Sequence, residues 1–289
     1  MHYEGLVYRP PSEAGSILLQ ATTGCSHNKC SFCGMYKGRR FSIKPDEVIF
    51  ADIDYAARAF PTARRLFICD GDALIIPQKR LLPILQRIQA VLPRVNRVGI
   101  YANGKGLRLK TPEELRELRN HGLGIIYMGL ESGDDTTLVR MRKGEDAAGM
   151  IAMGKRAREA GILLSLTVLL GIAGKERSQI HAEATGRVLS AIDPEFVGAL
   201  SLMLEPGTPL MAEIQAGRFA LPEPLDMLRE LRTMIETTTL SGGLFHANHA
   251  SNYLPIRARL PEEKAATLAL LDAALEGKLA LKPEAFRAL

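Results

Sequence analysis

The sequence predicts an α/β fold, a partial (βα)6 TIM-like barrel with a helical C-terminal extension. Six short apolar segments alternate with longer amphipathic segments, the order expected of strands that are each followed by a helix. The strand candidates have apolar cores, which predicts a parallel sheet covered by helices on its outer face. Six units form a shorter structure than the closed eight-unit barrel. A doubly wound open sheet has the same alternation, so the spacing leaves that topology open.

The expected strands and helices follow one another along the first two thirds of the chain. Strands are expected at residues 16–23, 65–69, 97–102, 124–130, 163–170 and 196–203. Helices are expected at residues 45–60, 79–92, 111–121, 147–160 and 179–191. Pro45 and Pro112 are each followed by acidic residues, which is typical of a first helical turn. Gly122 and Gly161 are placed to end helices.

The pattern changes after about residue 215, so we expect the barrel at residues 1–215 and the extension at 216–289. The extension is expected to cap the barrel. Helices are predicted at residues 222–237 and 261–276, and between them lies an irregular polar segment at residues 246–253.

The composition excludes several classes of protein. The chain has 289 residues, of which 46% are hydrophobic and 24% charged, so intrinsic disorder is excluded as the main state. No run of about 18 apolar residues could cross a membrane. The first residues have no basic and apolar signal pattern, so a cytoplasmic location is expected. The net charge of +5 permits an RNA partner, but aromatic residues are only 6% of the chain and Trp is absent, which weakens base stacking.

Three of the four cysteines lie within nine residues, directly after the first expected strand, at positions Cys25, Cys30 and Cys33. In a reducing compartment such a cluster is more often metal-binding or catalytic than disulfide-forming. Three thiolates can ligate three irons of a [4Fe–4S] cluster. Zinc would require a fourth ligand, for which His27 is the candidate, and an unrelated trio is the third alternative. Cys69 is expected to be a buried strand residue.

The cysteine loop resembles that of the radical S-adenosylmethionine (SAM) superfamily, in which three cysteines hold a [4Fe–4S] cluster and the open iron binds SAM. The usual loop has an aromatic residue before the last cysteine, and Phe32 matches it. The resemblance implies that Phe32 flanks the adenine. The chain departs from the usual spacing, because four residues rather than three separate Cys25 from Cys30.

Three further motifs follow later strands in the order of the family. Gly71 and Asp72 match a turn that receives the SAM ammonium group. Glu131 matches an acid that contacts polar groups of SAM, and Arg142 or Lys143 matches the basic residue for its carboxylate. These segments resemble the branch that contains methylthiotransferases and oxygen-independent coproporphyrinogen oxidase. Gly171 matches the adenine-side glycine. The alternative interpretation is that the glycines serve turns and the charges lie on the surface.

Substrate contacts are expected from the barrel rim and from the polar segment of the extension. Glu205 follows the sixth expected strand. The polar segment offers a set of hydrogen-bonding side chains, His246, Asn248, His249, Asn252 and Tyr253. The alternative is a surface loop that satisfies its own backbone. His181 is interpreted as a packing or capping residue.

The resemblance implies a radical SAM enzyme that reductively cleaves SAM and abstracts hydrogen from an unidentified small molecule. No side chain is assigned as catalytic, because the cofactor supplies the reactive species. The expected partners are the substrate and an electron donor such as flavodoxin or ferredoxin, with RNA less supported. The alternative from another class is a non-enzymatic zinc or iron–sulfur module that could bind RNA.

Overall fold

The computed structural model describes residues 1–288, which divide into two compact units. The first unit comprises Met1–Asn28, Tyr36–Met128 and Met153–Leu164. The second comprises Lys29–Met35, Gly129–Ala152 and the chain from Ser165 onward.

The first unit is built on parallel strands in the order β1-β4-β5-β6. These are β1 (Ile17–Leu19), β4 (Arg65–Ile68), β5 (Arg97–Ala102) and β6 (Leu123–Glu131), whose last residues enter the second unit. A small antiparallel sheet pairs β2 (Thr22–Thr23) with β3 (Ser42–Ile43). The helical segments are η1 (Pro11–Glu13), α1 (Asp46–Ala59), η2 (Ala73–Ile75), α2 (Gln78–Val91), α3 (Gly104–Arg108), α4 (Pro112–Asn120) and α6 (Ala147–Glu159), which begins in the second unit.

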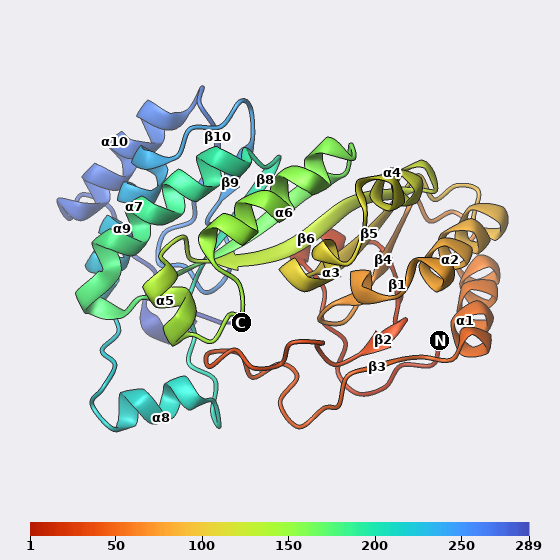
Figure 1. Ribbon diagram of the computed structural model, residues 1–289. Helices are drawn as coiled ribbons and strands as arrows, with labels where there is room; N and C mark the ends of the chain where they lie inside the picture. Colours follow the sequence, from red (N-terminus) through yellow and green to blue (C-terminus); the bar gives the residue numbers. More distant parts are fainter. Residues whose placement is uncertain (289) are drawn as a thin grey trace. The chain divides into compact units, whose positions relative to one another are not determined.

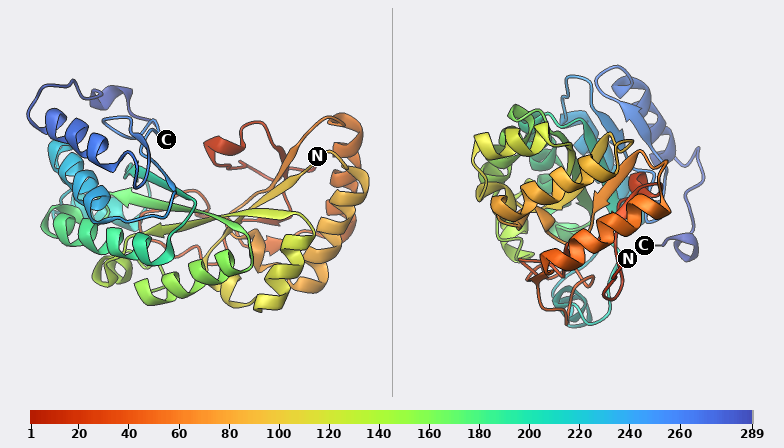
Figure 2. Two further views of the ribbon diagram at one scale, coloured as in Figure 1. Left: turned by 90° about the horizontal axis from the view of Figure 1, so that it is seen from above. Right: turned by 90° about the vertical axis from the view of Figure 1, so that its right-hand side faces the viewer.

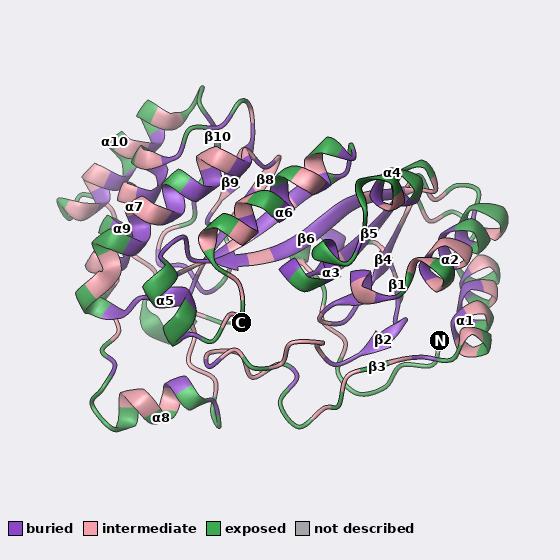
Figure 3. Ribbon diagram, viewed as in Figure 1, coloured by how far each residue is buried: buried purple, intermediate pink, exposed green. Residues whose placement is uncertain are grey.

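Burial in the first unit follows the two periodicities of the sequence. Leu66, Phe67 and Ile68 of β4 are all fully buried, as expected for a strand covered on both faces. The helices α1 and α2 lie side by side (Figure 1), and each buries one stripe, for example Ile49 and Ile53 of α1. Figure 3 shows the buried strands and the exposed outer faces of these helices.

The second unit also contains a mostly parallel set of strands, in the order β7-β8-β9-β10. Strands β7, β8 and β9 pair in parallel, and β10 is antiparallel to β9. These are β7 (Leu163–Leu170), whose first residues belong to the first unit, β8 (Phe196–Ser201), β9 (Leu244–His246) and β10 (Arg257–Arg259). The helical segments are α5 (Asp135–Arg140), α7 (Gly174–Ile192), α8 (Pro209–Gln215), α9 (Pro224–Thr237), α10 (Lys264–Leu275) and η3 (Glu284–Phe286). Helix α9 packs against α7, and α10 packs against α9 (Figure 2).

The α/β class and the mostly parallel strand pairing agree with the prediction. The first expected strand is divided into β1 and β2, and the helix expected at 179–191 begins earlier, at Gly174. The extension is less helical than expected, because β9 and β10 lie within it and β9 pairs with β8. Among residues 1–288, no helix is long and apolar enough to cross a membrane.

Candidate functional site

Gly71 packs directly against the first cysteine of the loop. Its backbone N–H donates to the Gly24 carbonyl at 3.0 Å. A Cβ atom at Gly71 would lie 2.7 Å from Cys25 Cβ and 2.9 Å from Tyr36 Cε2. Contacts this short are not tolerated, so only glycine allows the turn after β4 to approach the Cys25 segment. Gly71 is therefore required by close packing and not by a positive φ angle.

Asp72 is buried beneath the residue that follows Cys25. Ser26 Oγ donates to its carboxylate at 2.5 Å, and the Asn103 backbone N–H donates at 3.3 Å. Asn103 Nδ2 also donates to Ser26 Oγ at 3.0 Å, which closes a three-residue network. Burial raises the pKa of Asp72 to about 6, although these hydrogen bonds oppose the shift. Asp72 thus holds the cysteine loop in addition to any contact with a ligand.

Asn103 is a site residue that the sequence reasoning missed. It follows β5, and its side chain accepts from the Gly106 backbone N–H at 2.9 Å, as an N-cap of α3 does. The signal in the sequence is the short Asn-Gly-Lys-Gly segment at the carboxyl end of an expected strand.

The longer gap between Cys25 and Cys30 contains a residue in the left-handed conformation. Asn28 has a φ angle of 43°, and asparagine tolerates this region better than most residues. Its side chain donates to the carbonyl of Tyr36 at 2.8 Å and to that of Arg39 at 3.3 Å. The turn at Asn28 is therefore anchored to the segment that follows the cysteines.

The second part of the loop is fixed by its backbone within the second unit. The Ser31 N–H donates to the Met141 carbonyl at 2.9 Å, and the Leu210 N–H donates to the Ser31 carbonyl at 2.9 Å. Ser31 lies between Cys30 and Phe32, so these bonds anchor both neighbours. The ends of α5 and α8 therefore position Cys30 and Phe32.

Phe32 packs against an apolar cluster of the second unit. The buried members of this cluster are Met141, Ile172, Leu202, Leu210 and Phe219. Ile172 belongs to the segment that includes Gly171, so the aromatic residue and the expected adenine-side segment contribute to one apolar surface. This arrangement is compatible with the predicted contact to an adenine ring.

Glu131 and Lys143, both predicted to contact SAM, form an ion pair with each other. Lys143 Nζ donates to Glu131 Oε1 at 2.9 Å, and the two side chains are 11% and 12% exposed. Glu131 has a φ angle of 64° and ends β6. Arg142 is exposed, so Lys143 is the better candidate of the two predicted basic residues.

Gly171 ends β7 in a turn with a φ angle of 83°, which favours glycine. Its N–H donates to Glu230 Oε1 of α9 at 2.6 Å. A Cβ at this position would also lie 2.8 Å from Met227 Cε. The turn is thus held by the extension, an arrangement that the sequence did not indicate.

Glu205 lies beside the glycine that follows Cys33. A Cβ at Gly34 would be 3.2 Å from Glu205 Oε2. The structure therefore brings this predicted substrate residue close to the cysteine loop within one unit. Its place after β8 agrees with the expected position at the strand end.

Two residues of the polar segment in the extension are occupied by structural contacts. Asn252 accepts from the Ser201 N–H at 2.8 Å and donates to the Ala199 carbonyl at 2.8 Å, which ties the segment to β8. Tyr253 donates to Glu284 at 2.6 Å and accepts from Arg287 at 2.6 Å. Burial raises the pKa of Tyr253 to about 12. Both side chains are buried, which favours a structural role over the predicted substrate contact.

The remaining polar residues of the segment are more accessible. Asn248 is exposed, whereas His246 and His249 are half-buried. His249 Nδ1 lies 3.0 Å from Ser251 Oγ. Burial lowers the pKa of His246, and the buried Nε2 of His246 has no hydrogen-bond partner among the described residues. His246 is therefore the residue of this segment with the clearest unused polar atom.

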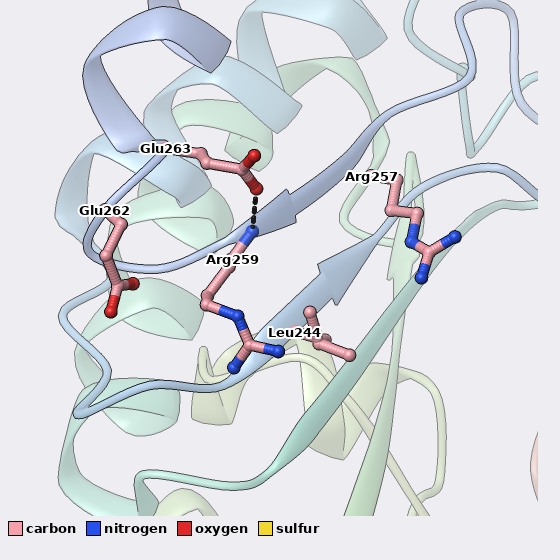
Figure 4. A pocket seen from close by; sticks show the side chains of 5 residues that line it. All are labelled: Leu244, Arg257, Arg259, Glu262 and Glu263. Atoms are coloured by element: carbon pink, nitrogen blue, oxygen red, sulfur yellow. Dashed lines mark hydrogen bonds between the residues drawn. The ribbon is translucent and has the colours of Figure 1, made fainter.

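A surface pocket of about 360 Å³ lies at β9 and β10 (Figure 4). Two arginines and two glutamates line it together with one apolar residue, namely Leu244, Arg257, Arg259, Glu262 and Glu263. Glu263 accepts from the Arg259 backbone N–H at 2.6 Å. The charges balance, and none of the site residues predicted from the sequence lines this pocket.

The cysteines offer the chemistry that an iron–sulfur cluster requires. In the described chain all four are thiols, and the loop cysteines are partly accessible whereas Cys69 is fully buried. Burial raises the pKa of the Cys69 thiol, which disfavours the thiolate that binds metals. Within residues 1–288, no three His, Cys, Asp or Glu side chains form a ready-made metal-ion site. The soft donor set of the loop, Cys25, Cys30 and Cys33, fits a [4Fe–4S] cluster.

Comparison with protein families gives one extended match. The model described as the radical SAM superfamily matches residues 19–183, which is more than half of the chain. The matched region includes all three loop cysteines and the segments around Gly71, Glu131 and Gly171.

Similar proteins agree with this match. The heme chaperone HemW of Bacillus subtilis is 23% identical over 194 residues, which cover 67% of this chain and 50% of that protein. Among solved structures, coproporphyrinogen III oxidase (HemN) of Escherichia coli covers 94% of this chain and 61% of its own, with 16% identity and a TM-score of 0.60. The radical SAM methyltransferase TsrM of Kitasatospora setae, with tryptophan and a SAM analogue bound, covers 90% and 52%, with 20% identity and a TM-score of 0.60. The chain thus spans half the length of the curated relative HemW.

Proposed function

The chain belongs to the radical SAM superfamily, and we propose that it reductively cleaves SAM and abstracts hydrogen from a small-molecule substrate. Membership confirms the family expected from the sequence, the α/β fold and the cofactors, a [4Fe–4S] cluster and SAM. It also places the chain in a superfamily of enzymes. The proposal rests chiefly on the conjunction of the cysteine loop with the Glu131–Lys143 pair at the end of β6.

We assign the cluster to the thiolates of Cys25, Cys30 and Cys33. When bound, the reduced cluster and SAM supply a 5′-deoxyadenosyl radical that removes a hydrogen atom from the substrate. The chain fixes the loop separately in each unit. In the first unit, Gly71 and Asp72 hold the segment of Cys25, and in the second unit the backbone bonds of Ser31 hold its neighbours. Rigid support of this kind keeps ligands in productive geometry.

We assign SAM recognition to charged and apolar groups of the second unit. Glu131 and Lys143 neutralise each other in the described structure, and we assign Glu131 to polar groups of SAM and Lys143 to its carboxylate. Phe32 and Ile172 offer apolar surface for the adenine. The apolar surface also excludes water from the reacting groups.

For the substrate, Glu205 and His246 are the strongest of the predicted residues. Glu205 lies beside the cysteine loop, and His246 has a buried ring nitrogen without a partner among the described residues. Both positions offer polar groups to a small molecule that carries hydrogen-bonding or cationic groups.

Anaerobic reconstitution tests the proposal. The purified chain is expected to be brown, with absorbance at about 400 nm from thiolate-to-iron charge transfer. With dithionite and SAM it should release 5′-deoxyadenosine. Cys30→Ala should abolish the product, whereas Cys69→Ala, a control at the buried cysteine, should still form it. A colourless protein with one zinc ion, or product formation by Cys30→Ala, would contradict the proposal.

A second candidate is a binding protein that holds the cluster without turnover. It is favoured by one comparison, because the similar protein HemW is named a heme chaperone. This candidate predicts stoichiometric hemin binding and no 5′-deoxyadenosine from the reconstituted chain. Substituting His246 with alanine tests whether its free ring nitrogen contributes to hemin binding, and product formation without hemin binding would reject this candidate.

A further inference from the structure

A buried chain of polar side chains connects the turn after β6 with the turn after β7. Ser132 Oγ lies 2.7 Å from His181 Nδ1, and His181 Nε2 lies 3.4 Å from Glu230 Oε1. The same Glu230 oxygen accepts from the Gly171 N–H at 2.6 Å. This series of contacts therefore runs from Ser132, the residue next to Glu131, through His181 of α7 and Glu230 of α9, to Gly171, the expected adenine-side glycine.

The groups around the His181 ring favour one tautomer. His181 Nδ1 faces two hydroxyl groups, Ser132 Oγ at 2.7 Å and Thr185 Oγ1 at 3.3 Å. Each hydroxyl already accepts from a backbone N–H, that of Asp134 or Gly133, and each can donate its own hydrogen to Nδ1. The tautomer with its hydrogen on Nε2 directs that hydrogen to the side of the Glu230 carboxylate, 3.4 Å away. The opposite tautomer would place a lone pair against that carboxylate, which is unfavourable.

Glu230 accepts hydrogen bonds from two elements and lies close to His181. The Gly171 N–H donates to Oε1 and Ser178 Oγ donates to Oε2, whereas His181 Nε2 lies 3.4 Å from Oε1 without a hydrogen bond to it. A carboxylate that is only 1% exposed requires such partners, because an uncompensated buried charge is strongly unfavourable. The Gly171 N–H therefore helps to stabilise the buried Glu230 carboxylate, and this carboxylate in turn holds the Gly171 turn.

The Ser132 turn is held equally closely by α7. The Gly133 N–H donates to Thr185 Oγ1 at 2.8 Å, and a Cβ at Gly133 would lie 2.5 Å from the Ala184 carbonyl oxygen. Any shift of α7 would therefore move the backbone that follows Glu131. Ser132, His181 and Glu230 resemble a Ser–His–acid triad in order, but the serine and the histidine are 0% exposed, so they do not contact a substrate.

We propose that His181 and Glu230 are positioning residues that hold the turns at Glu131–Gly133 and Gly171 at a fixed separation for SAM. Helix α9 of the extension is thereby part of the cofactor site, although it lies outside the region matched by the family model. This inference rests on the proposed function, because it concerns the same SAM site. It predicts that substitutions on α9 alter SAM affinity without altering the cluster ligands.

The test measures SAM binding to the reconstituted protein by equilibrium dialysis, together with the change that SAM causes in the electron paramagnetic resonance spectrum of the reduced cluster. Glu230→Leu leaves the Gly171 N–H without its acceptor and should weaken SAM binding roughly 10-fold or more. Glu230→Gln keeps a carbonyl oxygen for that N–H and should stay within about 3-fold of wild type. Iron content should be unchanged in both variants.

Thr238→Val is the matched control, because Thr238 Oγ1 is also buried near the end of α9 and donates to the Met234 carbonyl at 2.6 Å. It should lower the melting temperature while SAM affinity and the SAM-induced spectral change stay as in wild type. A purely structural role for Glu230 would instead give Glu230→Leu the same behaviour as this control, and that result would overturn the inference.

His181→Leu provides a second measurement should Glu230→Leu not retain iron. It removes the link between Ser132 and Glu230 while Gly171 keeps its acceptor, and several-fold weaker SAM binding is expected. Wild-type affinity in His181→Leu overturns the inference. If the wild-type protein holds the cluster but binds no SAM, the proposed function fails. Failure of the positioning role is a different result, in which wild type binds SAM and the variants bind it equally well.

Discussion

At the scale of single residues, Gly71 carries a sharp prediction for the cluster loop. Gly71→Ala would place a methyl group 2.7 Å from Cys25 Cβ, and relieving that overlap costs about 1–3 kcal/mol or displaces the loop. We expect less than about half of the wild-type iron content after reconstitution, because loosely held ligands bind metal 10–100-fold more weakly. Iron and sulfide assays measure the effect.

Gly15→Ala is the control for this substitution. The nearest atom to a Cβ at Gly15 is Arg65 Nη2 at 3.5 Å, an ordinary contact, and its φ angle is not positive. Iron content should stay at the wild-type level in this variant. Equal iron loss in both variants would show that Gly71 has no special relation to the loop.

Asp134 gives a prediction about pH. Burial opposes its ionisation, but bidentate bonds from Arg177 at 2.8 and 2.9 Å and bonds from Thr137 outweigh burial and lower the pKa to about 2. Because the folded pKa lies below the unfolded value, the ionised carboxylate stabilises the fold above about pH 4, and this contribution is lost as the pH falls toward 2. Asp134→Asn should lower the unfolding free energy by about 1–2 kcal/mol at pH 7.

Urea titrations at pH 7, 5, 4 and 3 measure this difference. The gap between wild type and Asp134→Asn should be constant at the two higher pH values and narrow at the two lower ones. Asp226→Asn, at an exposed pair with Arg229, should change stability by less than about 0.5 kcal/mol. A gap that is independent of pH would contradict the assigned cause.

At the scale of elements, the polar segment after β9 contains two asparagines with different structural roles. Asn252 bonds to the backbone of Ser201 and Ala199, whereas Asn248, four residues earlier, is exposed. Asn252→Ala leaves a buried N–H and a buried carbonyl of β8 without partners and should lower the unfolding free energy by about 2–4 kcal/mol. Asn248→Ala should lower it by less than about 0.5 kcal/mol. Denaturant titration of both variants decides whether Asn252 is the anchor.

The same elements show what the sequence could predict. The apolar runs at 97–102 and 163–170 predicted β5 and β7 with the observed bounds, because continuous apolar segments are the signal of covered strands. β9 and β10 have three residues each, too few for a periodicity, and were missed. The helix start at Gly174 was missed because its capping position carries no polar side chain.

The site was predictable where chemistry is local and unpredictable where it depends on distant partners. The cysteine loop is a contiguous motif, and the family match confirms the family that the motif indicated. The bond between Gly171 and Glu230 joins residues 59 positions apart on different elements, and no spacing rule connects them. The Glu131–Lys143 pair was predictable in part. Both residues were predicted as SAM contacts, but their contact with each other is visible only in the fold.

At the scale of the whole molecule, the net charge of +5 predicts electrostatic attraction to an acidic electron donor such as flavodoxin or ferredoxin. Lys37 and Arg40 follow the cysteine loop and are exposed. Reversing both to glutamate should slow cluster reduction by reduced flavodoxin about 10-fold at low salt, because long-range charge attraction steers association. The difference should shrink at about 0.5 M salt, at which surface charges are screened.

Stopped-flow bleaching of the cluster absorbance measures this rate, and dithionite provides the internal reference. Dithionite is small and needs no docking surface, so its reduction rate should differ little between wild type and the double variant at high salt. Reversing Arg64 and Arg94 to glutamate is the charge-matched control, because both arginines are exposed and directly precede or lie shortly before β4 and β5, at the opposite strand ends from the cysteine loop. Because net charge acts on every face alike, equal slowing by the Arg64 and Arg94 reversals would assign the effect to overall charge. Slowing confined to the Lys37 and Arg40 reversals would instead locate the docking surface beside the cysteine loop.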